Sequence, residues 1–214
     1  MNKRLFHVLD GQAFVRVEMA ARPFNWGSIE DLISHDTMRQ LCALYPVTGF
    51  ASTQSIAQSK CYRMYYRPWL CRGETHKTTD DLDPLWASLR ADLTSTSYRE
   101  ALERLCNIDL SQSQLEITFW RYGVGCWLSP HTDKAGKILS HLFYFNEEWK
   151  SNYGGSLKIL NSSDITDCAV ELQPNAQESV VIVRCEHSWH AVTPVRASAH
   201  RMQRKSLQIV FWRA

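Results

Sequence analysis

The second half of the chain is a succession of short β-branched and aromatic runs, and this pattern restricts the fold more than any other feature. The runs begin at about residue 113 and are LEITFWRY, KILSHLFYFN, GGSLKIL, CAVELQ, SVVIVR and KSLQIVFW. Turn signals such as SNYGG, NSSD and QPNAQ lie between them. Many short strands joined by turns at close spacing are typical of an all-β sandwich or jelly roll.

Helical patterns dominate the first 112 residues. Apolar residues recur near helical spacing between Ser28 and Pro46, which predicts a helix with Ser28 as its N-cap and Pro46 as its stop. Asp83-Pro84 predicts the start of a second helix, because Asp is a good cap and Pro suits the first helical position. A third helix is expected over residues 98–107.

Short strands are also expected in this half, at VRVEM near residue 15 and YRMYY near residue 62. We interpret the segment CYRMYYRPW as an ordinary amphipathic strand rather than the wall of a binding site. No repeat, low-complexity segment or linker divides the chain. We therefore predict one α+β domain, in which residues 1–112 form a helix-rich support and residues 113–214 form a jelly-roll core.

Charge and hydropathy argue against several classes of protein. The net charge of +2 is too small to favour nucleic acid as the main partner, and no apolar run of about 18 residues predicts a membrane span. The N-terminal MNKRLFHVLDGQ lacks the apolar region of a secretory signal. Seven cysteines without a CxxC pair fit a reducing compartment better than a disulfide framework or a thiolate zinc site. We expect a cytoplasmic protein with no membrane or nucleic-acid partner.

The stretch WLSPHTDKAGK carries the first chemical signal. His131 and Asp133 are two residues apart, so an extended chain directs both side chains to one side. A third ligand could come from EHSWHAVTPV, where His187 and His190 compete and only one is expected to point inward. Two histidines and one carboxylate on one face of a metal ion leave positions open, which is typical of non-haem Fe(II) oxygenases.

The last predicted strand adds a second signal. In RMQRKSLQIVFW, Arg204 and Ser206 lie on one face, and Lys205 is expected to face the other way. A guanidinium can bind a carboxylate through two hydrogen bonds, and a hydroxyl can add a third. This combination suits the far end of a dicarboxylate co-substrate.

Together these motifs resemble the Fe(II)/2-oxoglutarate-dependent oxygenases of the prolyl-hydroxylase-like kind. The resemblance covers about residues 115–213, and its motifs occur in the order Tyr122-Gly123, His131-x-Asp133, FYFNEEW, GGSLKIL, His190-AVTPV and Arg204-x-Ser206. It implies a double-stranded β-helix, or cupin-like jelly roll, as the catalytic core. It also implies Fe(II) as the cofactor and 2-oxoglutarate and O₂ as co-substrates.

The resemblance implies a role for each matching residue. The metal ligands would be His131, Asp133 and His190, and the contacts of 2-oxoglutarate would be Arg204, Ser206, Tyr144 and Tyr122. His190 is preferred to His187 because an apolar residue and a TPV-like turn follow it. Arg204 is preferred to Arg201 because it keeps the Arg-x-Ser register into the last strand, although both lie farther from His190 than is usual in the family.

The implied reaction is hydroxylation of an unactivated C–H bond, with release of succinate and CO₂. By analogy within the superfamily, we expect a small substrate of the amino-acid type that is free, in a peptide or bound to a carrier protein. Peptidyl-proline hydroxylation is the alternative, and desaturation or cyclisation of a biosynthetic intermediate also remains open. A nucleic-acid demethylase, a cupin-like dioxygenase that does not use 2-oxoglutarate and a non-catalytic binding module are less favoured.

Overall fold

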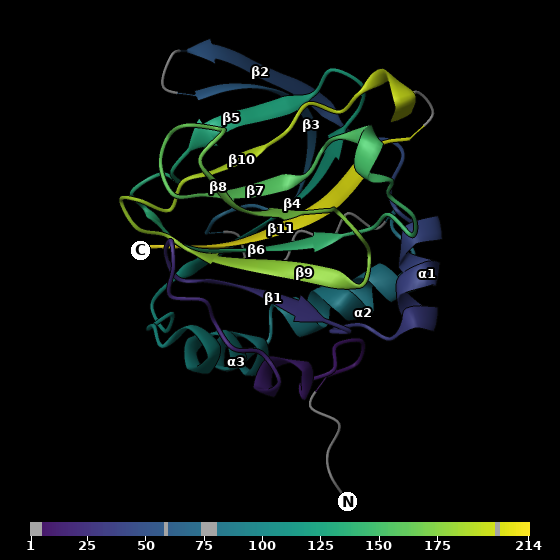
Figure 1. The fold of residues 1–214 in the computed structure, drawn as a ribbon. Coiled ribbons are helices and arrows are strands. Elements are labelled where there is room, and N and C mark those ends of the chain that lie inside the picture. Colours follow the sequence, from purple (N-terminus) through teal and green to yellow (C-terminus); the bar gives the residue numbers. More distant parts are fainter. Residues whose placement is uncertain (1–5, 58–59, 74–80, 200–201) are drawn as a thin grey trace, which may run out of the picture.

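A curled, antiparallel sheet of eleven strands forms the body of the protein in the computed structural model (Figure 1). The structure describes residues 6–57, 60–73, 81–199 and 202–214. The strands are β1 (Trp26–Glu30), β2 (Ala51–Ala57), β3 (Lys60–Leu70), β4 (Gln114–Tyr122), β5 (Trp127–His131), β6 (Lys137–Tyr144), β7 (Leu157–Leu160), β8 (Cys168–Leu172), β9 (Glu178–Val183), β10 (His190–Val192) and β11 (Arg204–Trp212).

The strand order bends the sheet into two facing layers. Neighbouring strands follow the order β1-β9-β6-β11-β4-β3-β5-β10-β7-β8, and β2 pairs with β3. Figure 1 shows β5, β10, β7 and β8 above β4, β11, β6 and β9, with β3 leading from one layer to the other. This arrangement confirms the predicted jelly-roll, or double-stranded β-helix, core. Each of the six runs predicted as strands in the second half contains a strand of the sheet.

The structure describes three α-helices: α1 (His35–Ala43), α2 (Pro84–Leu93) and α3 (Thr96–Cys106). In Figure 1, α2 and α3 lie toward the bottom of the lower layer and α1 stands at its right side. The predicted cap of α2 is confirmed, because the Asp83 side chain accepts a hydrogen bond from the backbone N–H of Leu85. The helix predicted over residues 98–107 is α3, and the Ser95 side chain caps it. None of the described helices is long and apolar enough to cross a membrane.

The helix predicted from Ser28 is wrong in its first part. Residues Trp26–Glu30 instead form β1, which pairs with β9 at the edge of the sheet. The helix starts only at His35, and its N-cap is Ser34, whose hydroxyl accepts from the N–H of Thr37. The apolar spacing of this segment fits a strand followed by a helix as well as one long helix. Residues 26–30 form a strand because they pair with β9, about 150 residues away.

Of the two short strands predicted in the first half, one is confirmed. YRMYY lies within β3, whereas VRVEM forms no strand and begins at the end of a short 3₁₀ helix, Ala13–Val15. The sequence did not reveal β1 or β2. The first half therefore contributes three strands to the sheet as well as its helices, and the division into a support and a core remains an interpretation.

Successive side chains of β4, β6 and β11 point alternately to the two faces of the sheet, and each face is buried in a different way. One face packs against the helices, and its residues include Ile117, Phe119, Leu139, Phe143, Leu207, Ile209 and Phe211. The other face looks into the space between the two layers, where a cavity of about 370 Å³ lies. Each strand thus supplies an apolar core on one side and a functional surface on the other.

Candidate functional site

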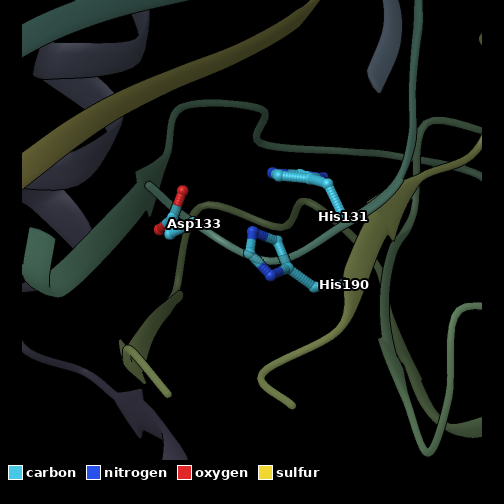
Figure 2. A group of neighbouring side chains, drawn as sticks. All are labelled: His131, Asp133 and His190. Carbon is cyan, nitrogen blue, oxygen red and sulfur yellow. The ribbon is translucent and has the colours of Figure 1, made fainter. Parts of the chain in front are cut away.

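Three buried side chains converge in this cavity, and Figure 2 shows them pointing toward a common space. The candidate ligand atoms of His131, Asp133 and His190 all lie within 4.8 Å of one another. His131 is the last residue of β5 and His190 the first of β10, and the two are direct cross-strand partners. Their ring centroids are therefore only 4.2 Å apart. Asp133 follows β5 by two residues and joins them from the same segment.

Backbone carbonyls fix the orientation of both imidazoles. Nδ1 of His131 lies 2.9 Å from the carbonyl of Ser129, and Nδ1 of His190 lies 2.8 Å from the carbonyl of Ser188. A carbonyl can only accept, so Nδ1 carries the hydrogen in both rings. The Nε2 atoms are then left with free lone pairs, which is the form in which histidine binds a metal.

The surroundings of the two histidines favour their neutral forms. Burial lowers the pKa of His131 well below its ordinary value, and the nearby His190 and Lys60 add to this effect. Burial also lowers the pKa of His190, although Asp133 opposes the shift. Neutral imidazoles need not lose a proton before they bind a metal, so the site is ready for a cation at neutral pH.

Asp133 is held as a carboxylate by two side chains of β6. Nζ of Lys137 lies 2.8 Å from Oδ1, and the Ser140 hydroxyl donates to Oδ2 over 2.9 Å. Burial alone would raise the pKa of Asp133, but the charge and hydrogen bond of Lys137 outweigh it and lower the pKa below its ordinary value. The carboxylate is therefore ionised and has a fixed orientation.

The hydroxyl of Ser140 ends a chain of hydrogen bonds across the floor of the cavity. The Trp120 indole donates to Oε1 of Gln208 over 3.1 Å, and Nε2 of Gln208 lies 3.5 Å from Oγ of Ser140, which in turn donates to Asp133. An indole can only donate and a carboxylate can only accept. The direction of every hydrogen bond in the chain is thus determined, and three strands together orient one carboxylate.

The other end of the cavity holds a buried cation with unused hydrogen-bonding capacity. Arg204 is only 1% exposed, and its guanidinium lies 4.8 Å from the Tyr122 ring and 5.0 Å from the Tyr144 ring. Its Nη1 donates to the Ser206 hydroxyl over 3.3 Å. Nη2 of Arg204 and the hydroxyl of Tyr144 are both buried and have no hydrogen-bond partner among the described residues. Such groups are costly to bury alone, and a carboxylate would satisfy both.

The glycine doublet shapes the position of this arginine. Nε of Arg204 donates to the carbonyl of Gly155 over 2.8 Å. Both Gly154 and Gly155 have positive φ angles, and a Cβ on Gly154 would lie 2.1 Å from the carbonyl oxygen of Pro194. The sequence suggested only a turn at this doublet. In the structure the same turn also lets the backbone approach and orient the guanidinium.

The structure also locates most of the other residues that the sequence analysis named. His187 is exposed, whereas His190 is buried beside His131. Lys205 faces away from the cavity as expected, with its ammonium over the Tyr45 ring. Arg201, the alternative to Arg204, lies outside the described residues. The Tyr122 hydroxyl contacts the sulfur of Met64 at 3.4 Å, so it is the ring of Tyr122, rather than its hydroxyl, that contacts Arg204.

Sequence reasoning missed much of the cavity wall. Lys137, Ser140 and Gln208 carried no motif. Ser140 and Gln208 lie an even number of residues from the predicted inward residues Tyr144 and Ser206, which was a usable signal, whereas Lys137 lies an odd seven residues before Tyr144. The interpretation of CYRMYYRPW as a merely amphipathic strand is wrong, because its inner face lines the cavity. The lining residues from this strand are Lys60, Tyr62, Met64 and Tyr66.

Comparisons with known proteins agree with this geometry. Residues 117–212 match the family model described as the 2OG-Fe(II) oxygenase superfamily. A prolyl-4-hydroxylase from Pseudomonas putida is similar in structure, with a TM-score of 0.60 and 20% identity over 88% of this chain and 92% of that one. An oxidoreductase of the 2OG-Fe(II) oxygenase family from Burkholderia pseudomallei has a TM-score of 0.61, with 15% identity over 88% and 85% of the two chains. A prolyl hydroxylase from Trichoplax adhaerens has a TM-score of 0.62, with 16% identity over 87% and 83%.

Proposed function

We propose that this chain, whose residues 117–212 match the family model of the 2OG-Fe(II) oxygenase superfamily, hydroxylates an unactivated C–H bond of a small amino-acid-type substrate. The substrate would be free, in a peptide or bound to a carrier. As a 2-oxoglutarate-dependent iron dioxygenase, the enzyme uses Fe(II), 2-oxoglutarate and O₂ and forms succinate and CO₂. The observation that supports the proposal best is that one cavity contains both the His131, Asp133, His190 cluster and a buried arginine with a free donor.

The donor set of the cluster fits Fe(II). Two neutral imidazole nitrogens and one carboxylate oxygen are the ligands of facial-triad iron sites, and all three side chains are buried. We assign His131, Asp133 and His190 as the ligands. Bound Fe(II), with 2-oxoglutarate and O₂, supplies the oxidising power that breaks the C–H bond.

The protein's own contribution is to bind and orient. Arg204 and Tyr144 hold the two unpartnered donors and bind the C5 carboxylate of 2-oxoglutarate, with Ser206 fixing one side of the guanidinium. The Tyr122 ring covers the guanidinium from one face and keeps water from it. A salt bridge between a carboxylate and a desolvated arginine is stronger than one in water, so this end of the cavity positions the co-substrate.

We also propose a reducing, cytoplasmic location. All seven cysteines are free thiols in the structure, and Cys42, Cys106 and Cys126 are buried. Burial raises the pKa of both Cys42 and Cys106 to about 12, so these thiols stay protonated and unreactive. They act as small apolar side chains.

The proposal is tested by turnover of the purified chain with Fe(II), 2-oxoglutarate and O₂. Free amino acids, capped amino acids and a proline-containing peptide are screened for succinate release and for a product heavier by one oxygen atom. With ¹⁸O₂, label is expected both in succinate and in the hydroxylated product. Oxidation that proceeds equally well without 2-oxoglutarate would instead identify a dioxygenase of the cupin-like kind, and a dehydrogenated product without added oxygen would identify a desaturase or cyclase.

A further inference from the structure

The cavity carries more positive charge than the proposed metal and co-substrate can balance. Its lining contains four cationic side chains and two carboxylates: Lys60, Lys134, Lys137 and Arg204 against Glu116 and Asp133. Fe(II) and 2-oxoglutarate carry opposite charges of equal size, so binding both leaves this excess unchanged. A cavity with a residual positive potential attracts an anionic ligand.

Two of the four cations already have assigned partners. Lys137 is paired with Asp133 at 2.8 Å, and Arg204 lies at the proposed carboxylate end of 2-oxoglutarate. Lys60 and Lys134 have neither an ion pair nor a hydrogen bond from their side chains to any described residue. Lys134 is exposed and Lys60 is partly buried, so solvent screens the charge of Lys134 more effectively. The uncompensated charge inside the cavity is therefore that of Lys60.

The backbone next to Lys60 is hydrogen-bonded to the strand that carries the metal cluster. The N–H of the next residue, Cys61, donates to the Ser129 hydroxyl of β5 over 2.8 Å, two residues before His131. Burial lowers the pKa of Lys60 to about 8; Asp133 opposes this shift, and Lys137 and Lys134 add to it. The field of Lys60 also reaches His131, whose pKa it helps to lower. The Lys60 side chain thus lines the same cavity as the metal cluster, in a partly desolvated and electropositive position.

We propose that Lys60 binds a carboxylate of the substrate and thereby holds the reacting carbon near the metal cluster. The inference rests on the proposed function and narrows its substrate to molecules that carry this group. A carboxylate matches the single charge of the one desolvated ammonium, whereas a phosphate carries about −1.5 to −2 at neutral pH. The rings of Tyr62, Tyr66 and Trp212 also line the cavity and offer apolar surface to the rest of the molecule.

The test uses simple probes and does not require the natural substrate. The protein is loaded with Mn(II) and saturated with N-oxalylglycine, a redox-inert analogue of 2-oxoglutarate that fills the Arg204 site. Paramagnetic relaxation of the methyl protons is then measured for acetate and for neutral acetamide. Acetate is expected to relax faster than acetamide. Lys60→Met is expected to reduce the acetate effect by about tenfold, which corresponds to the loss of one hydrogen bond to a charged group.

Matched variants separate the role of Lys60 from general effects of charge and folding. Lys60→Arg retains the positive charge and is expected to retain most of the acetate effect. Lys150→Met removes an exposed lysine outside the cavity and is expected to change nothing. Comparable relaxation by acetate and acetamide in the wild type, or an undiminished acetate effect in Lys60→Met, overturns the inference.

Two further measurements show whether the proposed function or only the inference fails, and which kind of molecule carries the carboxylate. Binding of Mn(II) and N-oxalylglycine is measured first by calorimetry, and its absence would contradict the proposed function and, with it, this inference. If both bind but acetate shows no Lys60-dependent effect, only the inference fails. N-acetylglycine and a capped peptide with one glutamate are then compared. A Lys60-dependent effect of either one supports the inference and distinguishes a small free acid from an acidic peptide side chain.

Discussion

The two faces of the central strands have the same backbone geometry and opposite chemistry. On β11, Leu207, Ile209 and Phe211 pack against the helices, while Ser206 and Gln208 face the cavity. The difference arises from what covers each face, because helices provide a dry apolar surface and the facing sheet layer leaves a cavity. One strand can therefore stabilise the fold and build a site at once, through every second residue.

Two buried histidines show what this difference means for function. His141 faces the helices, where its Nδ1 bonds to the Tyr98 hydroxyl at 2.8 Å, and burial lowers its pKa to about 3. His190 faces the cavity and is also buried with a lowered pKa, but it lies beside His131 and Asp133. Burial and a shifted pKa are common to both. A buried histidine forms a metal site only where other ligands lie close to it.

The sharpest test of this contrast is to remove a proposed ligand. His190→Ala is expected to lower the affinity for Co(II) or Fe(II) by more than about 100-fold and to abolish succinate formation, because loss of a ligand exceeds the effect of losing one of its supporting contacts. Metal titration and turnover measure the two effects. The matched control is His187→Ala, which removes an exposed histidine three residues earlier and should leave both unchanged. Equal effects of the two variants would falsify the assignment of the ligands.

A second test compares neighbouring cations on the two faces of β11. Arg204→Lys is expected to raise the KM for 2-oxoglutarate by about 100-fold, because the lysine loses the paired donors that suit a carboxylate. Lys205→Met, on the opposite face, should change it little. The KM is obtained from succinate formation at varied co-substrate concentration. A normal KM in the Arg204 variant would direct attention to Arg201.

The third test removes one support of Asp133. Ser140→Ala deletes the hydroxyl that donates to Oδ2 and is expected to weaken metal binding by about tenfold, while the Lys137 contact remains. Ser179→Ala is the control, since Ser179 is an equally buried serine of β9 whose hydroxyl bonds to the backbone of Ile29. Calorimetric titration with Co(II) measures both. An unchanged metal affinity in Ser140→Ala would show that Lys137 alone orients the carboxylate.

The last test concerns the stability of the apolar face. The pKa of His141 is about 3 in the folded chain and about 6.5 when unfolded, so between these values only the unfolded chain takes up the proton. The contribution of His141 to the free energy of unfolding is complete above pH 6.5 and is lost as the pH falls toward 3, by about 1.4 kcal/mol per pH unit. Urea unfolding of wild type and His141→Leu at pH 7, 5 and 4 measures it. The two curves should converge as the pH falls, and parallel curves would exclude the effect.

The predictability of the fold depended on how local each signal is. The six strand runs of the second half and the cap at Asp83 could be read directly, because alternation, turn residues and capping act within a few positions. The strand Trp26–Glu30 could not, because its pairing with β9 joins segments about 150 residues apart. Local spacing there favoured a helix, and the distant partner outweighed it.

The candidate site divides in the same way. The sequence by itself determined which side chains could act, because the two-residue spacing of His131 and Asp133 and of Arg204 and Ser206 sets each pair on one side of an extended chain. Only the tertiary structure decided that His190 lies across from His131 and that β6 supplies two donors to Asp133. It also decided that Lys60 borders the cavity with no ion pair or hydrogen bond from its side chain to a described residue. These relations come from strand pairing and burial, which depend on the whole sheet and leave no trace in neighbouring residues.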